Sequence, residues 1–126
     1  MSRDARSPRG KELATLAAEL ASDKGAEGIE LFDLRRKGAP AEWVVMCGGN
    51  NIVHNRAIAD SILKGVEERE GRVWHVEGAG ESRWILLDYV DVVVHVMLPE
   101  VREYYGLDAI WRETERRGTE GEGKGK

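Results

Sequence analysis

Two carboxylates lie close together in the C-terminal half of the chain and are the first candidates for chemistry. Asp88 and Asp91 flank the dipeptide Tyr89-Val90. Carboxylate oxygens are the ligands that Mg²⁺ prefers, so the pair could serve a metal-dependent nucleotidyl-transfer site. The spacing argues against this, because residues three apart on a regular strand point to opposite faces. Turn residues that accept hydrogen bonds from backbone amides are the alternative.

A glycine-rich junction, Gly48-Gly49-Asn50-Asn51, separates an apolar run from a helical pattern. Backbone amides at the start of a helix suit a phosphate group. The junction lacks the lysine of a P-loop and the spacing of a dinucleotide-binding motif. A tight turn with an asparagine cap is the competing interpretation, and the sequence leaves both open.

The remaining reactive side chains show no catalytic pattern. His54, His75 and His95 have no spacing typical of a zinc site. Cys47 is the single cysteine, so no disulfide can form within the chain, and its place at the end of an apolar run predicts a buried thiol. We therefore predict no catalytic residue, no metal ligand and no cofactor.

One predicted strand carries the pattern of a protein-binding surface. Trp84, Leu86 and Asp88 alternate with Ile85 and Leu87, so the two sets face opposite sides of the sheet. If Ile85 and Leu87 point into the core, a tryptophan, a leucine and a carboxylate share the other face, as in an interface hot spot. The alternative is that a helix covers this face, through the aromatic residues Tyr104, Tyr105 and Trp111.

The periodicity of apolar residues predicts an α/β fold in a single domain, with a mixed sheet of about five strands packed with helices. The predicted helices span about 9–24, 51–70 and 107–112, with one or two helical turns at 100–105. The predicted strands span about 28–34, 43–47, 73–77, 84–88 and 91–98. The first two strands are close enough in sequence to pair as a hairpin.

Composition limits the class of protein. The chain has 126 residues, of which 41% are hydrophobic and 33% charged, as in one globular domain. No apolar run reaches the ~18 residues of a membrane span. Residues 1–8 are predicted to be a flexible N-terminus, 9–112 the domain, and 113–126 a disordered charged tail, because glycine and charge dominate there.

The charge distribution favours a protein partner over a nucleic acid. The net charge is −4, and basic residues are in excess at both ends, so the middle of the chain is more acidic than the whole. An acidic surface repels phosphate backbones, which makes direct nucleic-acid contact minor at most. The same charge favours a basic protein, chiefly through association rate and specificity.

Several separated motifs together resemble the ribosomal silencing factor family, also called the Iojap family. They are Cys47-Gly48-Gly49-Asn50-Asn51 followed by His54, the run from Trp84 to Met97, and the segment with Tyr104, Tyr105, Leu107 and Trp111. The resemblance covers about residues 10–112. Val90 departs from it where glycine is usual, and Val53 departs where arginine is usual.

The resemblance implies a protein that is not an enzyme. Members of the family bind the large ribosomal subunit through ribosomal protein L-fourteen and block association with the small subunit. This represses translation in starved or resting cells. The implied fold is similar to nucleotidyltransferases without their active-site acids, and bacterial members are cytoplasmic. The implied contact residues are Trp84 as apolar anchor, with Leu86, Asp88, Tyr89 and Asp91.

Two other functions stay open at this point. A nucleotide-binding protein similar to nucleotidyltransferases would use Asp88, Asp91 and the glycine-rich junction, and would need Mg²⁺. A dimerisation or scaffold domain would use the face of Trp84 as a contact with a second copy. A homodimer is also compatible with the ribosomal role, since a C₂ contact could hide the same face.

Overall fold

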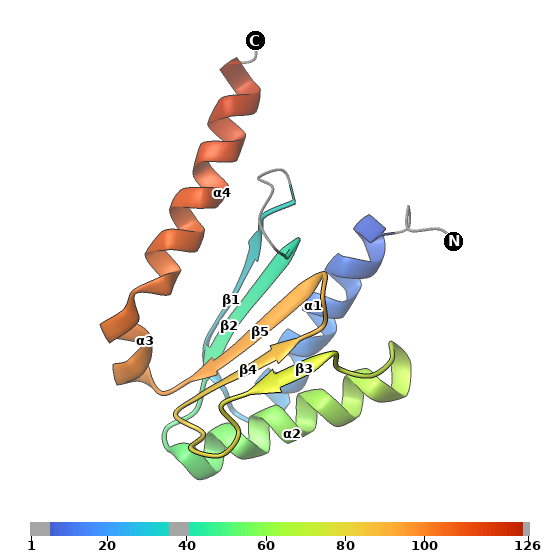
Figure 1. Cartoon of the computed structure of the whole chain (residues 1–126), viewed down its shortest axis with the longest axis vertical. Coiled ribbons are helices and arrows are strands. Elements are labelled where there is room, and N and C mark those ends of the chain that lie inside the picture. The colour runs from blue at the N-terminus through green and yellow to red at the C-terminus, as the bar shows by residue number, and fades with distance from the viewer. Residues whose placement is uncertain (1–5, 36–40, 125–126) are drawn as a thin grey trace.

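A mixed five-stranded sheet forms the middle of the molecule in the computed structural model (Figure 1). The structure describes the backbone of residues 6–35 and 41–124, and the side chains of 10–35 and 41–116. The strands are β1 (Glu27–Asp33), β2 (Trp43–Gly48), β3 (His75–Glu77), β4 (Trp84–Asp88) and β5 (Val92–Met97). Their order is β1-β2-β5-β4-β3, with β2 and β5 parallel and the other pairs antiparallel. The predicted mixed sheet and the hairpin of its first two strands are confirmed.

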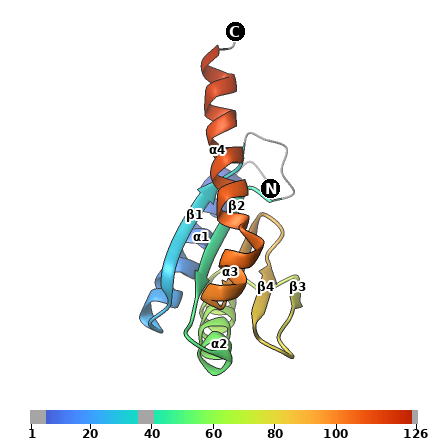
Figure 2. The ribbon, with the colours of Figure 1, turned by 90° about the vertical axis from the view of Figure 1, so that its left-hand side faces the viewer.

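Helices cover the two faces of this sheet unequally (Figures 1 and 2). Helices α1 (Arg6–Asp23) and α2 (Ile52–Arg69) lie side by side against one face. Helices α3 (Pro99–Tyr105) and α4 (Leu107–Lys124) lie on the other face, near β1 and β2. The half of that second face formed by β3 and β4 therefore has much less helical cover.

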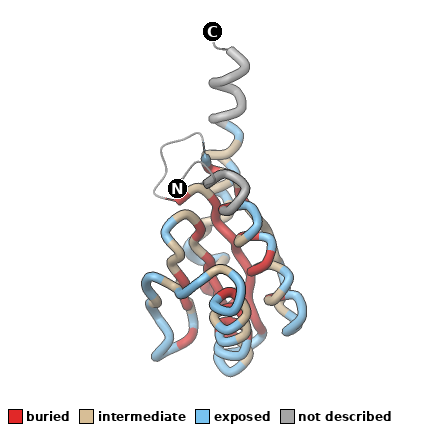
Figure 3. Tube along the Cα trace, turned by 90° about the vertical axis from the view of Figure 1, so that its right-hand side faces the viewer, coloured by how far each residue is buried: buried red, intermediate tan, exposed pale blue. Residues whose placement is uncertain are grey.

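Alternation along the central strands explains why their sequences are continuously apolar. On β2, Val45 and Cys47 join the core against α1 and α2. Val44 and Met46 point the other way and join the core beneath α3 and α4. A strand buried on both faces has no polar position, which accounts for the unbroken run that predicted it. Figure 3 shows the buried residues concentrated in the sheet and on the inner sides of the helices.

Both ends of the chain differ from the sequence prediction. Helix α1 begins at Arg6, so residues 6–8 are helical, and residues 1–5 lie outside the described part. Helix α4 continues to Lys124 where a short helix and then a disordered tail were predicted. Two contacts missed by composition support its middle turns: an ion pair of Glu113 with Arg116, and a hydrogen bond from the Asp33 amide to Glu115 Oε2 at 2.8 Å.

Two other findings concern the described part of the chain as a whole. Residues 36–40, between the first two strands, lie outside it. Among the helices in residues 6–35 and 41–124, none is long and apolar enough to cross a lipid bilayer.

Candidate functional site

The less covered half of the sheet carries the predicted binding residues. Trp84, Leu86 and Asp88 point to this side, while Ile85 and Leu87 are fully buried against α1 and α2. The predicted alternation is therefore confirmed. On β3, Glu77 pairs with Leu86 and His75 pairs with Asp88, so their side chains share this side. We call the surface of Trp84, Leu86, Asp88, His75 and Glu77 the docking face.

Trp84 is half-buried and its indole is held on two sides. Its Nε1–H donates a hydrogen bond to Nδ1 of His95 on the neighbouring strand, with 3.0 Å between the nitrogens. The ring of Tyr105 from α3 lies 4.9 Å away at an angle of 51°. A helix therefore covers one flank of Trp84, as the alternative predicted, and leaves the rest of the docking face open. Trp111 lies 6.2 Å from the His95 ring.

His95 is buried and serves as the hydrogen-bond acceptor that fixes this indole. Burial is the main cause that lowers the pKa of the imidazole to about 4; the charge of Asp108 raises it by less, and the charge of Arg102 lowers it slightly further. The ring is therefore neutral at pH 7, and Nδ1 keeps the lone pair that accepts from Trp84. A neutral, buried acceptor therefore limits the rotamers of Trp84 and holds the indole in one orientation.

The loop that leads into Trp84 is fastened to the first turns of α2. The buried Asn55 accepts a hydrogen bond from the Gly49 amide and donates one to the carbonyl of Ser82, both at 2.8 Å. Arg56 donates to the Ser82 hydroxyl at 2.8 Å and to the Gly80 carbonyl at 3.1 Å. These bonds give the start of β4 a fixed position.

The two aspartates of the first hypothesis form a turn. Asp88 Oδ1 accepts a hydrogen bond from the Val90 amide at 2.7 Å. The backbone carbonyl of Asp91 accepts from the amides of Glu42 and Trp43. Within the described residues, no group of three or more histidine, cysteine and acidic side chains is arranged to hold a metal ion. The turn interpretation fits these bonds.

Tyr89 lies apart from the other predicted contact residues. Its side chain packs against the core on the side of α1 and α2, whereas Trp84, Leu86 and Asp88 face the other side. Burial, together with the charge of Glu67, raises the pKa of its phenol to about 12. Tyr89 thus anchors the turn, and the structure does not bring it together with the docking face.

Side chains from the first turn of α2 accept hydrogen bonds from the amides of the glycine-rich junction, and the junction in turn caps that helix. The Gly49 amide donates to Asn55, the Asn50 amide donates to His54 Nδ1 at 3.1 Å, and the His54 amide donates to Asn51 Oδ1 at 2.9 Å. Asn51 is the N-cap of α2, which confirms the asparagine cap. A phosphate would have to displace these acceptors, so the junction is a structural turn.

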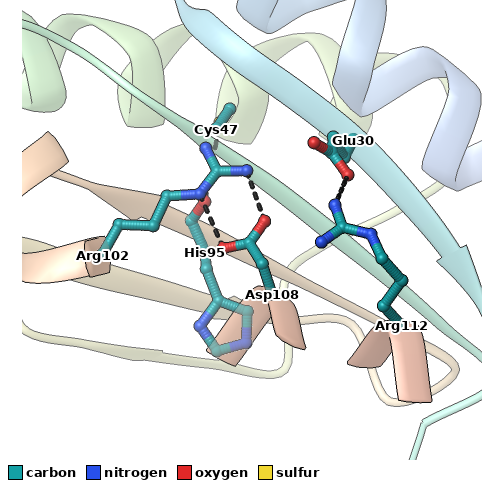
Figure 4. A network of polar contacts seen from close by, with 6 residues as sticks. All are labelled: Glu30, Cys47, His95, Arg102, Asp108 and Arg112. Carbon is teal, nitrogen blue, oxygen red and sulfur yellow. Dashed lines mark hydrogen bonds and ion pairs between the residues drawn. The ribbon is translucent and has the colours of Figure 1, made fainter. Parts of the chain in front are cut away.

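A cleft of about 510 Å³ opens between this junction and the start of α4. Its cationic groups are already paired (Figure 4). Arg102 donates two hydrogen bonds to Asp108, at 2.8 and 2.7 Å, and Arg112 donates to Glu30 at 2.6 Å. The bond from Arg102 lowers the pKa of Asp108, so the pair is ionised at neutral pH. Such paired guanidinium groups are poor receptors for a nucleotide phosphate.

Cys47 has no nucleophilic role in this arrangement. The thiol is buried, and burial raises its pKa to about 12. The neutral thiol packs in the core, as its position in an apolar run predicted.

Sequence reasoning missed Trp74, which is 70% exposed in the loop before β3. The sequence predicted a strand over 73–77 that included this residue, whereas β3 begins only at His75 and leaves Trp74 in the loop after α2. Only the structure shows that it lies next to the docking face.

A family model described as "Ribosomal silencing factor during starvation" matches residues 7–125. The chain is 37% identical over 101 residues to the ribosomal silencing factor RsfS of Bacillus subtilis, covering 80% of this chain and 86% of that protein. It is 35% identical over 102 residues to RsfS of Chromobacterium violaceum, covering 80% and 83%.

Two solved structures are also similar to this chain, in fold and in sequence. A crystal structure of a Chromobacterium violaceum protein superposes with a TM-score of 0.77 at 32% identity, covering 80% of this chain and 84% of that one. A Bacillus halodurans crystal structure superposes with a TM-score of 0.71 at 35% identity, covering 80% and 94%.

Proposed function

This chain belongs to the ribosomal silencing factor family, and from that premise we propose that it binds the large ribosomal subunit through ribosomal protein L-fourteen. Bound there, it keeps the small subunit from joining and represses translation in starved or resting cells. The observation that carries the proposal is the docking face, on which Trp84 is pre-oriented by His95 and Tyr105 beside the partly exposed Leu86 and Asp88.

The mechanism we propose is steric occlusion. The protein covers a surface that the small subunit needs, so position and affinity matter and no chemical turnover is required. A rigid sheet suits this task because the contact residues lie on regular strands, where their spacing is fixed. Trp84 is the apolar anchor, and a fully desolvated tryptophan is a common energetic centre of protein interfaces.

Charge on the docking face fits a basic partner. Glu77 and Asp88 lie on it, and the whole chain has a net charge of −4. We assign Asp88 or Asp91 to a pair with a lysine or arginine of the ribosomal protein. Contact with ribosomal RNA is minor in this proposal, because acidic groups repel the phosphate backbone. The role places the protein in the cytoplasm.

The nucleotide-binding alternative loses its support at two places. The Gly49 and Asn50 amides of the glycine-rich junction donate to Asn55 and His54, and Asn51 accepts from the His54 amide as the cap of α2. Asp88 caps the turn at Val90. We therefore propose a binding protein that is not an enzyme. A homodimer through the docking face stays an alternative that the experiment below must separate.

Co-sedimentation with purified large subunits tests the proposal. The wild type is expected to pellet with them and to block joining to small subunits. Trp84→Ala should weaken binding by about thirtyfold or more, which corresponds to the ~2 kcal/mol typical of an interface anchor. Lys64→Ala, on the exposed side of α2, is the matched control and should bind normally.

A second variant guards against a folding defect in Trp84→Ala. Asp88→Asn removes the charge and keeps the oxygen that accepts from Val90, so it should fold normally and still bind less tightly. If the wild type fails to bind large subunits at low salt, or if it blocks joining equally well with both substitutions, the proposal is wrong.

A further inference from the structure

A second large apolar side chain stands at the opposite end of the docking face from Trp84. Trp74 is 70% exposed, an unusual position for the residue with the largest apolar surface. It is held in place, since its amide donates to the Asp88 carbonyl at 2.9 Å and its ring lies 5.7 Å from that of His75. Its exposure is therefore a fixed feature of the fold.

Val90 adds to the same end of the surface. It is 56% exposed, with a φ of 76° that β-branched residues rarely adopt. The Asp88 side chain accepts from the Val90 amide, while the Asp88 carbonyl accepts from the Trp74 amide. Both apolar residues are thus fastened to one aspartate of the docking face.

The geometry along β4 sets the separation of the two apolar ends. Trp84 and Asp88 are four residues apart on one strand, which places them roughly 13 Å apart. Leu86 lies between them, with Glu77 opposite on β3. A stable interface of about 800 Å² on each partner easily spans this distance, so one partner can contact both ends.

We infer that Trp74 and Val90 form a second apolar anchor for the same basic protein partner, so that the partner is held at two points with acidic groups between them. The inference rests on the proposed function and adds to it a specificity residue outside the predicted contact set. Continuity with the docking face and the carboxylates of Glu77 and Asp88 are the reasons to assign this patch to a basic protein.

The test is a binding curve on purified large subunits with the full chain. Trp74→Ala should raise the dissociation constant about tenfold, since a flanking anchor contributes less than a central one. Trp74→Phe should recover most of that loss, because it restores an apolar ring. Val53→Ser is the matched control and should bind like the wild type. Val53 is 68% exposed and lies at the N-terminal end of α2, whereas Trp74 follows the C-terminal end of that helix.

Each outcome decides the inference. Weak binding by Trp74→Ala with normal binding by Val53→Ser supports it. Equal binding by wild type and Trp74→Ala, with Trp84→Ala weakened, overturns the second anchor and leaves the proposed function standing. Failure of the wild type to bind overturns both.

Self-association is measured in parallel by sedimentation velocity without ribosomes. A wild-type dimer that Trp74→Ala converts to a monomer, with no change in subunit binding, assigns the patch to a second copy and overturns the inference. A Trp74→Ala protein that keeps the wild-type oligomeric state and binds subunits weakly supports it.

Discussion

Val90 is a residue whose backbone is strained in the folded protein. Its φ of 76° lies in the left-handed region, where a Cβ collides with the backbone, and its side chain is largely exposed. Val90→Gly should therefore raise the free energy of unfolding by about 1 kcal/mol, the strain relieved less the extra flexibility of glycine in the unfolded chain. Urea denaturation measures this directly.

Val90→Ala separates strain from packing. Alanine keeps a Cβ in the left-handed region, so the urea midpoint of the Val90→Ala variant should stay near that of the wild type. A glycine variant no more stable than the alanine variant would show that the turn stores no strain. The sequence resemblance indicated a family in which glycine is usual here, and the structure shows that Val90 itself has a positive φ, which glycine adopts at little cost.

His95 makes stability depend on pH. In the folded protein, burial lowers the pKa of the His95 imidazole to about 4 from an ordinary value of 6.5. Between these values the unfolded chain binds a proton at this imidazole and the folded chain does not. The free energy of unfolding should therefore fall as the pH drops from about 6.5 towards 4, by at most about 3 kcal/mol.

The matched variant for this prediction is His95→Asn. Its amide oxygen can still accept from Trp84 Nε1, and it has no group that titrates in this range. Urea unfolding at pH 7, 5.5 and 4.5 should show a steeper loss for the wild type than for the variant. Parallel curves would mean that carboxylates alone cause the loss.

The alternation of residues along β4 correctly predicted which side of the sheet each contact residue faces, for as long as the strand is regular. Trp84, Leu86 and Asp88 lie together because period two holds through Asp88. Tyr89 could not be placed in this way, since the turn that follows redirects the chain and the phenol enters the opposite core. The exposure of Trp74 was missed because the strand predicted over 73–77 begins only at His75, which leaves Trp74 in a loop.

At the scale of elements, the elbow between α3 and α4 depends on one ion pair. Gly106 bends the chain with a φ of 61°, and Arg102 on α3 bonds twice to Asp108 on α4. Only 16% and 20% of these two side chains are exposed. Asp108→Asn should lower the free energy of unfolding by about 1–2 kcal/mol, less than the cost of breaking a fully buried pair.

Hydrogen exchange locates this effect. The amides of α4 should lose protection in Asp108→Asn more than those of α1. Glu30→Gln is the control, because Glu30 and Arg112 are 42% and 57% exposed and such a pair contributes at most about 1 kcal/mol. Equal loss of protection in both variants would contradict a special role of the elbow.

Helices and strands were predicted correctly where burial imposes a periodic pattern on the sequence. The extent of a helix was missed where contacts between residues far apart in the sequence determine it. The apolar run of β2 and the capped stripe of α2 are local signals, and both elements were found. The length of α4 depends partly on the hydrogen bond between the Asp33 amide and Glu115, 82 residues apart. Composition alone reads that segment as a charged, glycine-rich tail, so the helix was missed.

For the whole molecule, unequal cover of the sheet joins the fold to the proposed function. Helices α1 and α2 cover one face of the sheet and form the main hydrophobic core with it. Helices α3 and α4 close the second face over β1 and β2, and α3 also steadies Trp84 through Tyr105. The part left open is the docking face, so the same packing that stabilises the sheet defines the surface available to a partner.

The acidic character of the chain leads to a prediction about salt. If the docking face meets a basic ribosomal protein, raising KCl from about 50 to about 300 mM should weaken binding to large subunits by about tenfold, mainly through slower association. Asp88→Asn should bind more weakly at low salt and depend less on salt, because one attractive charge is gone. Trp84→Phe should be weaker at every salt concentration with an unchanged slope, because it alters apolar contact and leaves every charge in place. Association rates measured on immobilised subunits distinguish these cases, and binding that strengthens with salt would show that apolar contact alone drives the association.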